Sequence, residues 1–270
     1  MRIALSLLLV SGVAIGIVWT SGRWGGGRAS TDSERLSSSA PFLEAANELP
    51  NPAEPAFTVG QPRLLGRSAN WSRFAPVSRR IAARTAPLPD ARTVATLATR
   101  TEERTTNIVV VLGERTIGGL AWVHVRLPVL PNGRTGWVPR NALGGYTFLE
   151  TRLVVDRRRF RATLYRGGRE IFRAPVGVGT PQAPTPPGEF YVRLKLSGFD
   201  NPVYGPVAFG TNARSTTLTD WPGGGYIGIH GTNAPDLLPG RVSHGCVRMR
   251  NADILELSRM MPVGTPVTVH

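Results

Sequence analysis

One cysteine and two histidines near the end of the chain have the residue types and spacing of a nucleophilic catalytic site. Cys246 is the only cysteine in the sequence, His244 stands two residues before it, and His230 lies sixteen residues upstream of it. A thiolate attacks carbonyl carbons well, but a thiol is mostly protonated at neutral pH, so a nearby histidine has to accept its proton. These residues therefore predict acyl transfer through a cysteine nucleophile.

Two histidines compete for the role of general base. An extended segment would put His244 and Cys246 on one face, but side chains so close in sequence rarely align for proton transfer. His230 ends a separate β-rich segment, and catalytic pairs usually meet from separate segments in this way. We favour His230 as the base and keep His244 as the alternative.

The residues around Cys246 suit the same chemistry. Gly245 allows a sharp turn that brings backbone N–H groups close to a tetrahedral intermediate. A helical pattern follows from about residue 251 to 261, and we expect its first amides and its dipole to favour a thiolate at Cys246. A buried apolar cysteine and a zinc site with His230 and His244 are the other readings, but the zinc site lacks a clear fourth ligand. We expect no metal and no other cofactor.

Short β-rich runs surround these residues and have to position them. Residues 90–146 contain four or five β-branched and aromatic runs, and Asn132-Gly133 favours a tight hairpin turn, which together suggest a small barrel. A second β-rich unit covers residues 147–270 and ends in a helix and a strand. Residues 197–225 are weakly periodic, so we expect a long loop there that could act as a lid. The predicted fold class is mostly β.

Charge and composition narrow the choice of partner. The formal net charge is +14, and all but one of the basic residues are arginines, Lys195 being the exception. No run of five basic residues and no basic stretch interleaved with aromatics occurs, so we expect no nucleic-acid site. The diffuse charge favours an anionic partner such as a wall polymer or acidic lipid.

The N-terminal residues predict export. The apolar run from Ile3 to Trp19 has a length between those of a secretory signal and a short membrane span. We slightly prefer an uncleaved inner-membrane anchor in residues 1–20 to a cleaved signal. Residues 21–89 are rich in Gly, Ser, Pro and Arg, and we expect a linker that carries the folded part away from the membrane.

Two resemblances accompany these patterns. Residues 132–143, with the run Asn132-Gly133-Arg134-Thr135-Gly136-Trp137-Val138-Pro139, resemble the end of bacterial SH3-like domains. His230-Gly231-Thr232 followed by Ser243-His244-Gly245-Cys246-Val247-Arg248-Met249 resembles the signature of the L,D-transpeptidase (YkuD-type) catalytic domain. The loop Thr185-Pro186-Pro187-Gly188-Glu189-Phe190 is similar to another motif of that family.

The second resemblance implies a β-sandwich-like fold and acyl transfer on the stem peptides of peptidoglycan. It implies that Cys246 attacks the bond before the terminal D-Ala of a tetrapeptide stem, forms a thioester, and passes the acyl group to an amine of a neighbouring stem. It also implies that the thiol is a target of carbapenems. The implied catalytic residues are Cys246, His230, Gly231 through its carbonyl and Gly245 through its amide, and the implied substrate-binding residues are Ser243, His244, Arg248 and Thr232.

The sequence thus predicts an exported, membrane-tethered monomer with four parts. They are an anchor or signal in residues 1–20, a linker in 21–89, an SH3-like domain in 90–146 and a catalytic domain in 147–270. Two other functions stay open: an L,D-carboxypeptidase or other wall cysteine hydrolase, in which water resolves the thioester, and a non-enzymatic wall-binding protein.

Overall fold

A computed structural model describes residues 71–198, 200–215, 217 and 225–270 of the chain. The expected anchor, most of the expected linker and part of the expected lid lie outside these residues. Within the described ranges, no helix is both long and apolar enough to cross a membrane.

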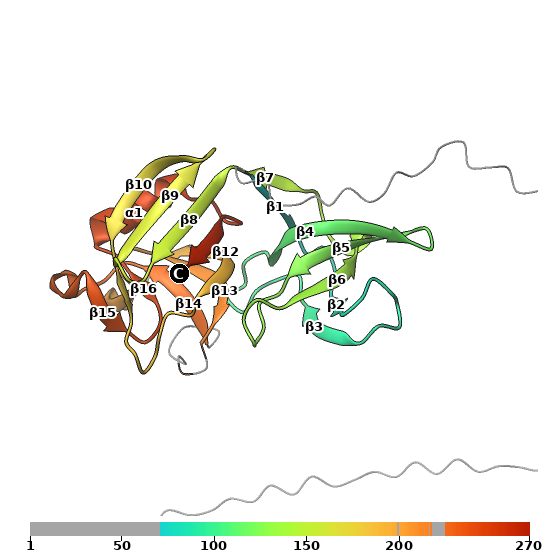
Figure 1. Ribbon diagram of the computed structural model, residues 1–270, viewed down its shortest axis with the longest axis horizontal. Helices are drawn as coiled ribbons and strands as arrows, with labels where there is room; N and C mark the ends of the chain where they lie inside the picture. The colour runs from blue at the N-terminus through green and yellow to red at the C-terminus, as the bar shows by residue number, and fades with distance from the viewer. Residues whose placement is uncertain (1–70, 199, 216, 218–224) are drawn as a thin grey trace, which may run out of the picture. The chain divides into compact units, whose positions relative to one another are not determined.

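The first of two sheets has seven strands in the order β3-β2-β6-β5-β4-β1-β7, all paired antiparallel (Figure 1). Its valines alternate along the strands, so that Val109, Val111, Val123 and Val125 meet in one apolar core. The elements are β1 (Ser72–Pro76), β2 (Ile81–Arg84), β3 (Thr93–Leu97), β4 (Ile108–Ile117), β5 (Leu120–Arg126), β6 (Thr135–Pro139), the short 3-10 helix η2 (Arg140–Ala142) and β7 (Thr147–Leu149).

The start of this sheet corrects an expectation from the sequence. Residues 72–84 were expected in the linker, but they form β1 and β2. β1 alternates between buried and partly exposed positions and pairs with β4 and β7 on its two sides, whereas β2 buries only Ala83. Arginine, serine and proline between the apolar residues hide this period of two, and only pairing with distant strands makes it stable.

The second sheet has ten strands in the order β10-β9-β8-β17-β12-β13-β14-β16-β11-β15. Three of its pairings are parallel: β8 with β17, β14 with β16, and β11 with β15. The elements are β8 (Thr151–Asp156), β9 (Arg161–Arg166), β10 (Arg169–Pro175), β11 (Gly177–Gly179), β12 (Gly188–Ser197), η3 (Pro202–Tyr204), β13 (Val207–Arg214), β14 (Tyr226–His230), η4 (Pro235–Leu237), β15 (Gly240–Ser243), β16 (Val247–Arg248), α1 (Asn251–Met260) and β17 (Pro266–Val269).

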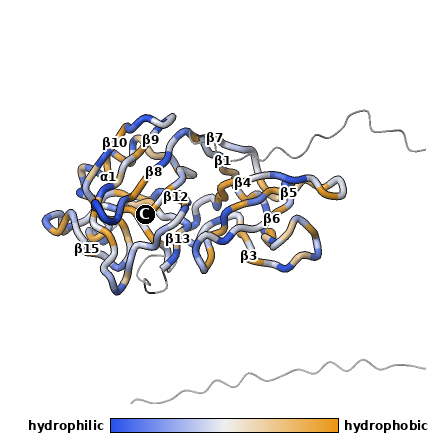
Figure 2. Tube along the Cα trace, viewed as in Figure 1, coloured by the Kyte–Doolittle hydropathy of each residue, from blue (hydrophilic) through white to orange (hydrophobic). Residues whose placement is uncertain are grey.

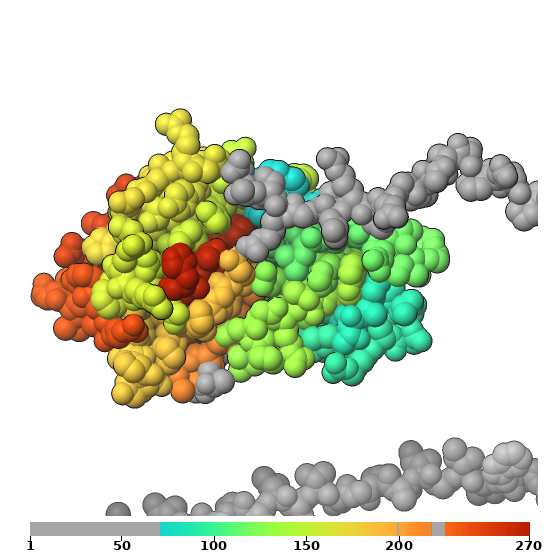
Figure 3. Space-filling model, in the orientation of Figure 1, coloured from blue at the N-terminus to red at the C-terminus, as the bar shows by residue number. Residues whose placement is uncertain are grey.

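One apolar core fills this second unit. Strand residues such as Leu164 and Phe209 meet Ile254 and Leu257 of α1 there, and Cys246 belongs to the same cluster. Apolar and polar stretches alternate along the strands (Figure 2). In Figure 3 the C-terminal residues are visible in dark red, consistent with β17 pairing with β8 on one side and β12 on the other.

The expected helix and final strand are confirmed within one residue at their ends, whereas the expected lid is wrong for much of its length. β13 occupies eight residues of the segment predicted as a loop, and seven of these are buried. Its sequence, Val-Ala-Phe-Gly-Thr-Asn-Ala-Arg, carries no alternation because a central strand between β12 and β14 is covered on both faces.

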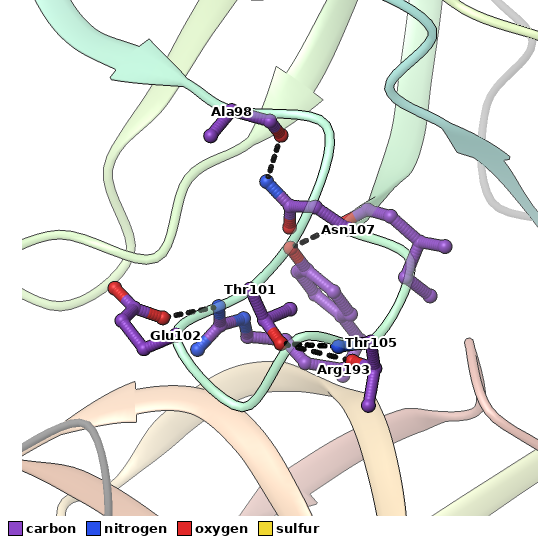
Figure 4. A network of polar contacts seen from close by, with 8 residues as sticks. Ala98, Thr101, Glu102, Thr105, Asn107 and Arg193 are labelled. Carbon is purple, nitrogen blue, oxygen red and sulfur yellow. Dashed lines mark hydrogen bonds and ion pairs between the residues drawn. The ribbon is translucent and has the colours of Figure 1, made fainter.

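The two sheets contact each other through buried groups. The Tyr191 hydroxyl donates to the carbonyl of Ile108 at 3.1 Å, and burial raises the pKa of that hydroxyl, which keeps it a donor. Arg193 has a side chain only 3% exposed; it lies 3.3 Å from the Glu102 carboxylate and 4.1 Å from the centroid of the Tyr226 ring (Figure 4). The first sheet therefore packs on β12, and Arg193 of β12 in turn contacts Tyr226 of β14, the strand that ends in His230.

Candidate active site

Cys246 lies in a tight connection between β15 and β16, next to β14. The residue is 6% exposed, and its Sγ accepts a hydrogen bond from the backbone N–H of Gly228 at 3.3 Å. β14 and β16 run parallel, with Ile229 opposite Val247 and His230 opposite Arg248. Strand pairing therefore places Cys246 beside Gly228, two residues before His230 on the same strand.

The relation of Cys246 to the helix differs from the expectation. The helix begins at Asn251 as expected, but we also expected its first amides and its dipole to act on Cys246, and β16 lies between the two. Because the effect of the helix dipole falls off within one turn, we no longer assign the helix a part in activating the thiol. The backbone amide that contacts the sulfur is that of Gly228.

His230 is fixed by a contact to the next residue in the chain. Its side chain is 2% exposed, and Nδ1 lies 2.6 Å from the carbonyl oxygen of Gly231. A carbonyl only accepts hydrogen bonds, so Nδ1 carries the proton and Nε2 of the neutral ring holds a lone pair. The ring of Tyr204 meets the imidazole edge-on, with centroids 5.2 Å apart and an angle of 69°. This arrangement leaves Nε2 as the basic atom of the ring.

The hydroxyl of Ser243 closes the cysteine loop internally. It donates to the carbonyl of Cys246 at 2.6 Å and accepts from the N–H of Gly245 at 3.2 Å. We expected Ser243 to contact substrate, but it is 1% exposed and both contacts are internal. The amide of Gly245, expected to face an oxyanion, is already bonded to Ser243 and would have to exchange that partner.

Thr185 ties a second loop to this one. Its Oγ1 donates to the carbonyl of Gly245 at 2.8 Å and accepts from the N–H of Gly179 at 2.9 Å, and the residue is 1% exposed. Gly245 has φ +119°, a conformation that only glycine adopts readily. One hydroxyl thus holds the turn beside Cys246 and the end of β11 together.

Asn251 joins the start of α1 to the segment after His230. Its Oδ1 accepts from the backbone N–H of Thr232 at 3.0 Å, and a Cβ placed on Gly231 would lie only 2.4 Å from the same oxygen. Thr232, expected to contact substrate, is 2% exposed, and its hydroxyl accepts from the backbone N–H of Ala234 at 3.1 Å. The contact holds the peptide unit whose carbonyl meets His230.

The remaining candidates, His244 and Arg248, differ in burial. His244 is exposed on the cysteine loop. Arg248 is partly buried; its Nη1 donates to the carbonyl of Val242 at 3.4 Å, while its Nε is buried without a hydrogen-bond partner among the described residues. Arg248 therefore braces the loop and keeps unused donors.

Three residues at this site escaped the sequence reasoning, although two of them stood inside patterns that it used. Thr185 belongs to the proline-rich loop compared with the family motif, and Asn251 was counted as the first helical residue, but neither was given a role. No signal pointed to Tyr204, since its contact with His230 spans 26 residues and depends on the path of the chain around η3.

Comparison with known proteins finds a family model that matches residues 150–269. These residues match a sequence model described as "L,D-transpeptidase catalytic domain", YkuD. Bacillus subtilis (strain 168) YkuD, whose name gives it as a candidate L,D-transpeptidase, is 38% identical over 108 residues, which are 40% of this chain and 58% of that protein. Escherichia coli (strain K12) YbiS, whose name also gives it as a candidate L,D-transpeptidase, is 59% identical over 46 residues. These are 16% of this chain and 15% of that protein.

A solved structure is also similar. The catalytic domain of an Enterococcus faecium L,D-transpeptidase is 28% identical, with a TM-score of 0.33, and the match covers 44% of this chain and 96% of that one. We draw nothing from this structural likeness because its TM-score is low. The chain spans just over half the length of the Bacillus relative that it matches.

Proposed function

We propose that the protein is a peptidoglycan L,D-transpeptidase with Cys246 as its nucleophile, because residues 150–269 match the model of the YkuD L,D-transpeptidase catalytic domain. The observation that carries the proposal is the parallel pairing of β14 with β16. It joins the strand that ends in His230 to the loop that holds Cys246, inside the matched residues.

In the first half-reaction, Nε2 of His230 takes the proton from the Cys246 thiol. The thiolate attacks the carbonyl carbon of the third stem residue, and the oxygen takes up the negative charge. The protonated His230 then returns its proton to the leaving amine, so that D-Ala departs and a thioester remains on Cys246. The contact from Nδ1 to Gly231 stabilises the imidazolium formed in between.

In the second half-reaction, an amine of a neighbouring stem attacks the thioester carbonyl. His230 accepts a proton from that amine, the carbon–sulfur bond breaks, and the thiolate recovers the proton from His230. An amide bond between two stems replaces the thioester, and the enzyme returns to its initial state. Water in place of the amine would give hydrolysis.

Donors for the developing oxyanion would come from the cysteine loop. The backbone N–H of Cys246, with that of His244, is the best candidate, because the N–H of Gly245 already bonds to Ser243. The Nε of Arg248, buried without a partner among the described residues, suits a carboxylate of the donor stem, since a guanidinium binds carboxylates through parallel hydrogen bonds.

Outside the catalytic domain, the proposal is that the chain acts on the wall from beyond the cytoplasm. The apolar run in residues 3–19 would export or anchor it, and the net charge of +14 would favour the acidic wall. The first sheet would be a wall-attachment module of the SH3-like kind.

Intact-protein mass spectrometry tests the nucleophile. We expect a disaccharide-tetrapeptide and, separately, a carbapenem to add a covalent mass to the protein. The adduct should map to Cys246 and be absent from Cys246→Ala. Cross-linked dimers among the tetrapeptide products identify a transferase, whereas shortened stems alone identify a hydrolase. A folded protein with neither adduct nor turnover would overturn the proposal.

A further inference from the structure

A second surface feature stands apart from the cysteine loop. A groove of about 770 Å³ is lined by the end of β7, the start of β8 and the last turn of α1. Its rim includes two aromatic residues, three basic residues and one acidic residue: Trp71, Phe148, Arg166, Lys195, Arg259 and Glu150. None of the residues assigned to catalysis lines it.

Two aromatic side chains on the rim are open to solvent. Phe148 is 61% exposed and Trp71 is 38% exposed, and they are the two aromatic members among the exposed large apolar side chains of the described residues. Their ring centroids are 5.8 Å apart at an interplanar angle of 57°. Exposing two aromatic rings to water is unfavourable, so a ligand that covered them would gain free energy of binding.

A buried charge holds this pair in place. The guanidinium of Arg73 lies 5.7 Å from the centroid of the Trp71 ring and 5.9 Å from that of Phe148. Arg73 is 5% exposed, and its Nε and Nη2 have no hydrogen-bond partner within the part of the chain that the structure describes. The pair is therefore preorganised, and the potential beneath it is positive.

The same groove is also lined by basic side chains. Lys195 donates to the carbonyl of Ser258 at 2.7 Å, and Arg166 donates to that of Met260 at 3.2 Å. Each of these two side chains therefore uses one N–H group to bind the end of α1. Arg259 is exposed beside them. Capping of α1 explains these two contacts, but it does not explain why the aromatic pair faces the same hollow. Three cations against the single carboxylate of Glu150 favour an anionic ligand.

We propose that this groove binds an acidic glycan. Sugar rings would pack their apolar faces on Phe148 and Trp71, while carboxylates on the sugars would pair with Lys195 and its two basic neighbours. The inference rests on the proposed function, because it identifies the glycan with the amino-sugar strand of peptidoglycan, whose lactyl groups end in carboxylates where no stem is attached. The groove would hold the wall polymer while the cysteine loop acts on its stems.

An acidic peptide is a weaker occupant on these observations. A peptide needs backbone donors and acceptors along the groove or a pocket for each side chain, whereas flat exposed rings suit pyranose faces. It serves as one arm of the test.

The test measures binding by isothermal titration calorimetry to the full chain carrying Cys246→Ala, so that no turnover occurs. The probes are stem-free glycan fragments with free lactyl carboxylates, neutral N-acetylglucosamine oligomers of the same length, and poly-glutamate. We expect the acidic glycan to bind most tightly. Phe148→Ala should weaken it by about tenfold, and Lys195→Gln by about threefold for the acidic glycan alone.

Matched controls are Leu120→Ala and Arg80→Gln, an exposed apolar residue and an exposed arginine outside the groove. They should bind the glycan as the parent does. Folding of Phe148→Ala is checked in a protein that keeps Cys246. If carbapenem acylates it at the wild-type rate, the variant is folded. If it does not fold, Lys195→Gln and Arg259→Gln, both on the surface, decide the outcome.

Equal affinity of Phe148→Ala and the parent for the acidic glycan would overturn the inference, as would poly-glutamate binding as tightly as the glycan. The proposed function fails differently. If no acyl adduct forms on Cys246 while the glycan still binds and responds to Phe148→Ala, the reaction is wrong and the groove stands. If the adduct forms and these variants leave the affinity for the glycan unchanged, the proposed function stands and the groove inference is wrong.

Discussion

The cysteine loop and the groove between β7 and α1 use polar groups in opposite ways. Around Cys246, the hydroxyls of Ser243 and Thr185 each make two internal hydrogen bonds, and the side chains are almost fully buried. In the groove, Phe148 and Lys195 are exposed and keep unused surface or donors. The difference teaches that the loop holds its atoms in one geometry, whereas the groove leaves side chains exposed, as the proposed glycan site requires.

The largest effect should come from substituting the two histidines, because His230 is buried at the end of β14 whereas His244 is exposed on the cysteine loop. His230→Gln should lower the rate of Cys246 acylation by about 10² to 10⁴-fold, because the variant removes the general base. His244→Gln, at an exposed position, should change the rate by less than about threefold, within what a surface contact contributes. Stopped-flow acylation by a carbapenem measures both. A larger loss in His244→Gln would reverse the assignment of the base.

Thr185 tests whether the loop needs its internal bonds. Thr185→Val should destabilise the protein by about 2 to 4 kcal/mol, because the N–H of Gly179 and the carbonyl of Gly245 lose their buried partner. Thr185→Ser keeps the hydroxyl and should recover most of that free energy. Thermal and urea unfolding give the values, and equal stability of the Val and Ser variants would show that the hydroxyl does not brace the loop.

Asn251 tests the segment behind His230 with a smaller change. Asn251→Ala removes the acceptor for the Thr232 N–H and should cost about 1 kcal/mol of stability. Acylation should slow by about tenfold, since the Gly231 carbonyl loses its support. Asn251→Asp retains an acceptor at this place and serves as the control. If Asn251→Ala acylates at the wild-type rate, Asn251 has no positioning role.

The smallest effect should come from salt, which should weaken wall binding and leave acylation of Cys246 nearly unchanged. Raising the salt concentration from about 0.05 to 0.5 M shortens the screening length and should weaken retention on isolated walls, because the groove and the surface are exposed and basic. Acylation of Cys246 by a small carbapenem should change little, since the Cys246 side chain is buried. Sedimentation with walls and mass spectrometry give the two readouts. Wall retention that ignores salt would contradict a role for charge.

Much of the catalytic half was predictable because its signals are local. Short stretches of sequence carry three of these signals: the motifs around His230 and Cys246, the helix after residue 250, and the final strand. β13 was missed because a strand buried on both faces has no period of two. β1 and β2 were missed because arginines and a proline obscure a pattern that only distant partners stabilise.

The sequence by itself determined that a lone thiol and two histidines stand within motifs that resemble those of L,D-transpeptidase domains, because residue types and short spacings carry that pattern. The tertiary structure decided how those residues are used. It turned Ser243 and Thr232 inward, bound Thr185 to the turn at Gly245, and set Asn251 behind His230, because hydrogen bonds between segments depend on strand pairing. It also assembled the groove from residues between Trp71 and Val263, a juxtaposition that no local pattern contains.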